Sequence, residues 1–263
     1  VAAPDQNGDP SLSSAIDITI DTTPPSTPSI TTTTELTKDN TPVIEGTAEA
    51  GSTVELFNGA ISLGTATAGS DGSFSITSSQ LPDNDYTLTV KATDALGNES
   101  TASNELAITI DATAPSTPSI TTTTSLTNDN TPVIEGTAEA GSTVELFNGD
   151  TSLGTATAGS DGTFSITSSE LADNSYTLTV KATDAAGNES EASAGLEIEI
   201  DTTPPSAPVI TTTTELTKDT TPLIVGNSDA NNVVNLFVNG ESTGDSVVSN
   251  ANGNFAISPS SSL

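Results

Sequence analysis

A 90-residue repeat is the feature that most constrains how this chain can fold. The motif Asp21-Thr-Thr-Pro-Pro recurs as Asp111-Ala-Thr-Ala-Pro and again as Asp201-Thr-Thr-Pro-Pro. Residues 21–110 and 111–200 differ at only 16 of their 90 positions, so they are two copies of one unit. Self-similarity at a fixed period is typical of arrays in which each repeat is one structural unit. We therefore predict a series of small domains rather than one large domain.

The two ends of the chain resemble parts of the same unit. Residues 1–11, VAAPDQNGDPS, align with residues 90–100, VKATDALGNES, and residues 252–257 align with residues 71–76. We expect the chain to be a window cut from a longer array. The sequence predicts the end of a preceding repeat at 1–20, complete repeats at 21–110 and 111–200, and a truncated repeat at 201–263.

Apolar and polar residues alternate within each repeat, and clusters of Gly, Asn, Asp and Pro separate the short alternating runs. A period of two predicts β-strands. Seven short strands in one repeat fit an immunoglobulin-like β-sandwich. The predicted fold class is therefore all-β, with tandem immunoglobulin-like sandwiches arranged end to end as a rod. In the first complete repeat we expect strands at 28–33, 42–48, 53–57, 62–68, 73–77, 86–93 and 105–110.

The differences between the two copies support this assignment. Ala107 and Thr109 of the first copy become Glu197 and Glu199 in the second, whereas the alternating Leu and Ile positions stay apolar. Charge is added only to the face that we predict to be wet. Low hydrophobic content and high charge are also typical of disorder, but this pattern favours a folded sandwich. Tyr86 and its copy begin a strand after a polar turn, where such sandwiches have a tyrosine corner.

The composition excludes several classes of function. The chain has 35 Asp and Glu against 4 Lys, no Arg, no His and no Cys, for a formal net charge of −31. Nucleic acid is not an expected partner, because phosphate backbones are bound by Lys and Arg. Direct membrane insertion is not expected, because no run of about 18 apolar residues occurs. No Ser-His or Cys-His nucleophile can be built, so we do not expect an enzyme.

The remaining chemistry is that of carboxylates, amides, hydroxyls and backbone carbonyls, which is the ligand set of Ca²⁺. If the strands alternate in direction, the loop at 94–100 and the junction residue Asp21 lie at the same pole of a repeat. That loop has an Asp at its start, a Gly for a sharp turn, and then Asn and Glu. The alternative is an ordinary solvated turn in which Asp and Asn bond their own backbone. The predicted calcium ligands are Asp21 with Asp94 and Asn98, Asp111 with Asp184 and Asn188, and Asp201, whose partner loop lies beyond the end of this chain.

Other acidic residues have a simpler interpretation. Asp71 lies in a GSDG segment, and Asp-Gly is a strong hairpin-turn signal. Asp83 and Asp85 lie in a short turn without aromatic residues that could hold a sugar, so we interpret them as weaker metal candidates and not as a catalytic pair.

Several motifs resemble the tandem Ig-like repeats of large bacterial surface adhesins and biofilm-associated proteins. They are the DxTxP junction, TPVIEGTAEAGSTVELFNG, GSDGSFSIT with GTFSIT, and TLTVKATDALGNES followed by LAITID. The resemblance covers essentially the whole chain. It implies export to the bacterial cell surface, extension of an adhesive tip away from the cell, and Ca²⁺ at or near the junctions between domains.

The function that we expect is that of a structural extender in a secreted or cell-surface adhesin, supporting cell adhesion and biofilm formation. Its partners would be the neighbouring Ig-like repeats of the same chain. Two alternatives remain at this point. One is a subunit of a self-assembling extracellular fibre, with other copies as partners, and the other is a ligand-binding adhesin module.

Overall fold

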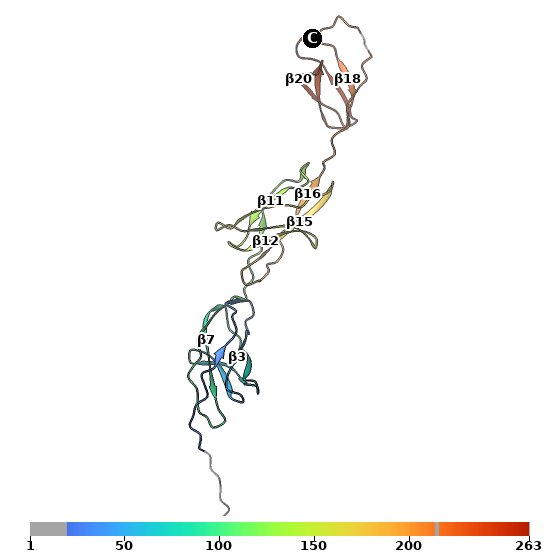
Figure 1. The fold of residues 1–263 in the computed structure, drawn as a ribbon. Coiled ribbons are helices and arrows are strands. Elements are labelled where there is room, and N and C mark those ends of the chain that lie inside the picture. The colour runs from blue at the N-terminus through green and yellow to red at the C-terminus, as the bar shows by residue number, and fades with distance from the viewer. Residues whose placement is uncertain (1–19, 214–215, 263) are drawn as a thin grey trace, which may run out of the picture. The chain divides into compact units, whose positions relative to one another are not determined.

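The computed structural model describes residues 20–213 and 216–262, and the regular elements among them are all strands. The predicted all-β class is confirmed. The strands gather in three successive groups, each preceded by a strand-free segment, at 21–28, 111–118 and 201–208 (Figure 1). No helix within the described ranges is long and apolar enough to cross a membrane. The predicted segment 1–20 lies outside these ranges except for its last residue.

The first complete repeat is a sandwich of two sheets. One sheet has the order β1-β3-β6 and the other β2-β8-β7-β4-β5. All pairs are antiparallel except β2 and β8, which run parallel. The eight strands are β1 (Ser29–Ile30), β2 (Leu36–Thr37), β3 (Val43–Thr47), β4 (Thr53–Asn58), β5 (Ile61–Thr67), β6 (Ser73–Thr77), β7 (Asn84–Thr93) and β8 (Leu106–Ile110).

Six of the seven predicted strands match an observed strand to within two residues at each end. The exception is the first, at 28–33, where the structure has only β1, followed by a second short strand, β2, in the other sheet. Asp71 also differs from its interpretation as a hairpin residue. It lies between β5 and β6, which belong to different sheets, so its turn carries the chain across the sandwich.

The second complete repeat has the same series of strands. Its first sheet has the order β14-β11-β9, and β12 pairs with both β13 and β15. The strands β10 and β16 form a parallel pair, as β2 and β8 do. The eight strands are β9 (Ser119–Ile120), β10 (Leu126–Thr127), β11 (Val133–Thr137), β12 (Thr143–Asn148), β13 (Thr151–Thr157), β14 (Thr163–Thr167), β15 (Asn174–Thr183) and β16 (Leu196–Ile200).

The core of the first repeat lies between its two sheets. Alternate residues of β3 and β6 are buried, as a half-buried strand requires. Ala107 is exposed and Thr109 half-buried, and their replacements Glu197 and Glu199 are exposed, so the added charges lie on the wet face. The buried cluster consists of Ile44, Val54, Leu56, Leu63, Ala68, Phe74, Ile76, Leu81, Leu88, Val90, Ile108 and Ile110.

A close contact between a glycine and a phenylalanine recurs in every group of strands. Gly46 of β3 lies opposite Phe74 of β6, and a Cβ atom at Gly46 would lie 2.4 Å from the Phe74 ring and 2.1 Å from the backbone oxygen of Ser29. Real side chains do not approach so closely. Glycine is therefore required here by space and not by backbone angle, and the same contact joins Gly136 to Phe164 and Gly226 to Phe255.

The predicted tyrosine corner is present in both complete repeats. The Tyr86 hydroxyl donates a hydrogen bond to the backbone oxygen of Pro82 at 2.8 Å, and Tyr176 donates to Ala172 at 2.9 Å. Each bond ties the start of a long strand, β7 or β15, to the loop before it.

The last group of strands has a smaller core. Among the described residues 201–262 no strand corresponds to β7 or β8, so β19 pairs only with β20. Val234, Phe255 and Ile257 are buried, whereas Val233, Phe237 and several other apolar residues are exposed. The strands are β17 (Val209–Ile210), β18 (Ile224–Asn227), β19 (Val233–Val238), β20 (Glu241–Val248) and β21 (Asn254–Ile257).

Candidate functional site at the repeat junctions

The loop after β7, residues 94–98, is organised around one carboxylate. Asp94 Oδ1 accepts hydrogen bonds from the backbone N–H groups of Leu96 and Asn98, both at 2.9 Å. The N–H of Asp94 donates to the backbone oxygen of Asn98 at 3.1 Å. Gly97 has a φ of 88°, in the region that glycine tolerates best. These bonds close a tight loop that presents Asn98 at a fixed place.

Asn98 links this loop to the residue at which the repeat begins. Its Nδ2 donates to Asp94 Oδ2 at 2.7 Å and to the backbone oxygen of Asp21 at 3.1 Å. The three residues predicted to meet are therefore brought together. Asp21 joins them through its backbone carbonyl rather than through its carboxylate.

The second complete repeat has the same arrangement. Asn188 Nδ2 donates to Asp184 Oδ2 and to the backbone oxygen of Asp111, both at 2.8 Å. The backbone N–H of Asn188 donates to Asp184 Oδ1 at 2.9 Å. Asn188 is buried, with 8% of its surface exposed, although it belongs to a surface loop. A buried amide with its donors satisfied is a specific structural contact and not a freely moving turn residue.

The junction carboxylates bond within their own segment. Each accepts a hydrogen bond from the backbone N–H two residues later, at 2.9 Å for Asp21, 3.3 Å for Asp111 and 3.1 Å for Asp201. Such bonds are typical of Asx turns. Within residues 201–262 nothing corresponds to the 94–98 loop, so the structure describes no Asn partner for Asp201.

The junction has the donor types that Ca²⁺ uses. Two oxygens from separate parts of the repeat, Asp184 Oδ2 and the carbonyl oxygen of Asp111, converge on the single amide nitrogen of Asn188. Convergent carboxylate and carbonyl oxygens, with an Asn side chain beside them, match the ligand class of a hard cation. Within the described ranges, no three His, Cys, Asp or Glu residues lie close enough to form an all-acidic metal cluster. A cation at this place would therefore draw on amide, carbonyl and water oxygens besides one carboxylate.

The loop carboxylates are held in their ionised form. The side chain and backbone of Asn98 donate to Asp94 and lower the pKa of that carboxyl below its usual value. For Asp184, burial alone would raise the pKa, but the hydrogen bonds from Asn188 and from neighbouring backbone groups outweigh it and the pKa is lowered. Both loops therefore present a negative charge near neutral pH.

A second contact holds the segment that leaves each repeat, and sequence reasoning gave it little weight. Asp83, just before β7, accepts a hydrogen bond from the N–H of Ala112 at 2.9 Å and another from the Thr113 hydroxyl. Asp173 does the same with the N–H and hydroxyl of Thr202, at 2.9 and 2.7 Å, and with the Thr203 hydroxyl at 2.8 Å. We call these contacts the exit latches.

The exit latches also shift the titration of their carboxyls. Hydrogen bonds from the Thr113 hydroxyl and the Ala112 N–H lower the pKa of Asp83, and bonds from Thr202 and Thr203 lower the pKa of Asp173. The signal that could have revealed them is the coincidence, in both copies, of an Asp before the tyrosine corner with a Thr two residues after the junction Asp.

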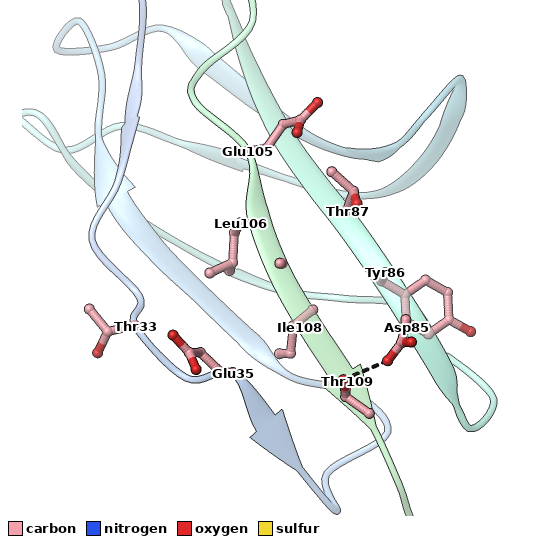
Figure 2. Close-up of a pocket in the computed structure, with 10 residues that line it drawn as sticks. Thr33, Glu35, Asp85, Tyr86, Thr87, Glu105, Leu106, Ile108 and Thr109 are labelled. Atoms are coloured by element: carbon pink, nitrogen blue, oxygen red, sulfur yellow. Dashed lines mark hydrogen bonds between the residues drawn. The ribbon is translucent and has the colours of Figure 1, made fainter.

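The first repeat also has an open surface hollow of about 780 Å³ beside β7, β8 and the segment that precedes β2 (Figure 2). Three carboxylates line it, those of Glu35, Asp85 and Glu105, together with the half-buried Tyr86. Asp85 is occupied by a hydrogen bond from the Thr109 hydroxyl at 2.6 Å. The hollow offers no basic anchor for an anionic ligand.

The family model for a bacterial Ig-like domain matches residues 19–112 and 114–202. The chain belongs to the bacterial Ig-like domain family. Two tandem Ig-like domains account for the two complete sandwiches, and the family assignment agrees with the resemblance seen in the junction and strand motifs.

Curated relatives of these bacterial Ig-like domains include two enzymes. Chitinase A1 of Niallia circulans is 37% identical over 130 residues, 43% of this chain and 17% of the relative. Exoglucanase B of Cellulomonas fimi is 34% identical over 173 residues, 59% of this chain and 15% of the relative. The chain therefore matches less than a fifth of the length of either enzyme. A solved structure of a biofilm-associated protein BSP domain has a TM-score of 0.28 and 26% identity, covering 68% of this chain and 30% of that one.

Proposed function

We propose that the chain is an extender segment of a secreted or cell-surface bacterial protein that supports cell adhesion and biofilm formation. The observation that carries the proposal is the bonding of Asp111. Its N–H donates to the backbone oxygen of Thr37 at 3.0 Å, and its carbonyl oxygen accepts from Asn188 at 2.8 Å. A single residue is thus bound by the repeat that ends and by the repeat that begins, which limits free rotation at the crossing.

The surface of the complete repeats supports a spacer rather than a ligand-binding module. Ligand sites usually combine a concave surface with aromatic or Arg anchors. The hollow beside β7 and β8 has one aromatic residue in its lining, Tyr86, whose hydroxyl already donates to Pro82, and its other lining residues are Asp, Glu, Thr and aliphatic residues. The excess negative charge of each repeat keeps neighbouring chains apart.

The length of the particle tests the extender role. The strand β7 has ten residues, about 33 Å at 3.3 Å per residue, so each added sandwich should lengthen an extended chain by about 35–45 Å. We expect this increase in maximum dimension, by small-angle scattering, when a further copy of residues 111–200 is inserted after residue 200. An increase of less than half this value would contradict the proposal. Electron microscopy of the same sample would reveal the filaments that the fibre alternative requires.

We further propose that Ca²⁺ binds at the junctions, held by Asp94 and Asn98 with Asp21, and by Asp184 and Asn188 with Asp111. A third site would begin at Asp201. When bound, Ca²⁺ would coordinate the carboxylate and carbonyl oxygens that otherwise accept hydrogen bonds from the Asn amide. Binding to the folded junction alone would raise the melting temperature by mass action.

The substitution Asn188→Asp should have opposite effects on the metal-free and the metal-bound junction, so it distinguishes the two forms. In chelator it removes two hydrogen bonds of about 1 kcal/mol each, so the second repeat should melt about 8–16 °C lower, at about 4–8 °C per kcal/mol for a domain of this size. In Ca²⁺ the added carboxylate becomes a ligand, and the loss should be reversed. Mg²⁺ at equal ionic strength is the control. If Ca²⁺ changes neither the wild-type nor the variant melt, the metal part of the proposal is wrong while the extender role still stands.

A second setting for the same spacer is a polysaccharide-degrading enzyme. The two curated relatives are named as a chitinase and an exoglucanase, and this chain matches only a small part of each. In such a protein the repeats would separate a catalytic domain from other domains. The sequence on either side of the repeats in the parent protein decides between the two settings.

A further inference from the structure

The first and last strands of each sandwich's larger sheet are neighbours in space. In the first repeat β2 runs parallel to β8, with Leu36 opposite Thr109 and Thr37 opposite Ile110. The N–H of Thr109 donates to the backbone oxygen of Glu35 at 2.8 Å. Figure 2 shows β8 lying between β2 and β7, with Glu35 and Thr109 near the joined ends.

The second complete repeat has the same pair. Leu126 of β10 lies opposite Glu199 of β16, and the N–H of Glu199 donates to the backbone oxygen of Ser125 at 2.9 Å. The N–H of Asp201 donates to Thr127 at 3.0 Å. Nothing in the role of a spacer requires this pairing, because an edge strand of two residues buries little surface.

The parallel direction determines how the pair responds to tension. The chain enters the larger sheet through β2 and leaves it through β8, so tension pulls β2 toward its N-terminal end and β8 toward its C-terminal end. In a parallel pair these two pulls act along the strands and in opposite senses. The hydrogen bonds lie across the strands and are evenly spaced, so they share the load and must break together. In a hairpin pulled from its open end, the bonds break one at a time.

We propose that the β2–β8 and β10–β16 pairs are mechanical clamps, and that each complete repeat bears tension along the chain. This function goes beyond spacing, and it holds whether the parent protein is an adhesin or an enzyme.

The two strands of the clamp are held differently: β8 is held by the core and by β7, whereas β2 is held mainly by its backbone hydrogen bonds to β8. Ile108 and Ile110 of β8 have at most 2% of their surface exposed, and β8 also pairs with β7 through five residues. Leu36 of β2 is 38% exposed, and β2 contributes only two paired residues. Tension should therefore separate β2 from β8 before it removes β8 from the core.

The exit latch strengthens the same place. Asp83 holds Ala112 and Thr113 immediately after the clamp, and Asp85 accepts a hydrogen bond from the Thr109 hydroxyl within it. Both acidic residues come from the start of β7 or the loop before it. Tension on the end of β8 must therefore break these bonds before the strand can peel away from β7.

The structure offers a matched pair of substitutions. In a strand the N–H and C=O groups of one residue point to the same side. The carbonyls of Glu35 and Thr37 face β8, so the N–H of Thr37 faces β8 and that of Leu36 faces solvent. Proline removes the N–H and is tolerated on an edge strand only where that group points outward. Thr37→Pro therefore breaks the clamp, and Leu36→Pro leaves its hydrogen bonds in place.

The experiment pulls the full chain by its two ends in a single-molecule force instrument. We compare the wild type with Thr37→Pro/Thr127→Pro, with Leu36→Pro/Leu126→Pro, and with Thr37→Ala/Thr127→Ala, which removes the hydroxyl and the γ-methyl group but keeps the backbone N–H. Each complete repeat should unfold in one event that releases the roughly 74 residues between Thr37 and Asp111, or about 240–270 Å of chain. The first double variant lacks the Thr37 and Thr127 N–H groups and should therefore unfold at a lower force than the wild type. The two control variants should keep the wild-type force.

A change of pulling direction tests the clamp without altering it. The chain has no cysteine, so Thr143→Cys/Thr157→Cys gives a unique pair of handles at the open end of the β12–β13 hairpin, where these residues lie opposite each other. Pulling there should unfold the second repeat at a lower force than pulling end to end, because the ladder opens bond by bond. Thermal melting of every variant shows whether it is folded.

Two results would overturn the proposal. One is an equal unfolding force for the Thr37 and Leu36 proline variants when both are folded. The other is an end-to-end force no higher than the hairpin force, and this comparison decides the question even if the Thr37 variant fails to fold. Neither result bears on the scattering test of the extender role.

Discussion

Replacing Gly136 by alanine should destabilise the second repeat more than any other single methyl group added to a strand of its smaller sheet. A Cβ atom there would lie 2.1 Å from the backbone oxygen of Ser119 and 2.4 Å from the Phe164 ring. To relieve this clash the backbone at Ser119 must move, which costs more than moving the end of a flexible side chain. Overpacking of a core typically costs about 1–3 kcal/mol, and contact with backbone places this site at the upper end, at about 3 kcal/mol.

Calorimetry of the full chain measures the effect against an internal reference. At about 4–8 °C per kcal/mol for a domain of this size, Gly136→Ala should lower the melting temperature of the second repeat by about 12–24 °C. The first repeat has its own Gly46–Phe74 contact and should melt as before, so one transition becomes two.

Gly141→Ala is the control for this prediction. Gly141 has a φ of 83° and nothing within 4 Å of an added Cβ, so alanine there introduces only backbone strain of about 1–2 kcal/mol. If Gly136→Ala lowers the melting temperature no more than Gly141→Ala does, the close contact with Phe164 does not determine stability and the reasoning is refuted.

Three further predictions concern the first repeat. Tyr86→Phe loses the hydrogen bond to Pro82 and should cost about 1 kcal/mol, seen as a fall of about 4–8 °C in a thermal melt; an unchanged melt would contradict a structural role for the tyrosine corner. Lys91→Gln breaks an ion pair with Glu99 at 2.9 Å that is largely solvated, so it should change stability by less than about 1 kcal/mol in a urea titration. Hydrogen bonds hold the pKa of Asp83 below its ordinary value of 3.8, so its contribution to stability is complete above that pH and is lost as the pH falls through the lowered pKa. Melting temperatures measured from pH 5 to pH 2 should therefore fall less in Asp83→Asn than in the wild type.

The alternation of apolar residues was sufficient to predict most of the strands. Val54, Leu56, Phe74 and Ile76 are buried and alternate with less buried neighbours, because a sandwich strand with one wet face leaves a period of two in the sequence. The strand β2 leaves no such pattern. Its two residues are held by backbone hydrogen bonds and bury little, and nothing in a run of Thr residues distinguishes them from a loop.

The junction, too, could be predicted only in part. The alternation of strand direction was sufficient to expect Asp94, Asn98 and the start of the repeat at one pole, and the structure brings them together. That Asp21 contributes its carbonyl oxygen while its carboxylate bonds Thr23 could not be predicted, because the orientation of a peptide group is not recorded in a side-chain pattern. The exit latch was given little weight for the same reason, since it includes the backbone N–H of Ala112.

The tyrosine corner gives each complete repeat its own optical reporter. The chain has two tyrosines and no tryptophan, and the two tyrosines occupy the corners of the two complete sandwiches, each with its hydroxyl bonded to a backbone carbonyl. Tyrosine fluorescence from this chain therefore comes from the complete repeats alone, one fluorophore from each, because residues 201–263 contain no tyrosine. Replacing one tyrosine by phenylalanine leaves a protein whose fluorescence follows the unfolding of a single chosen repeat without any added label.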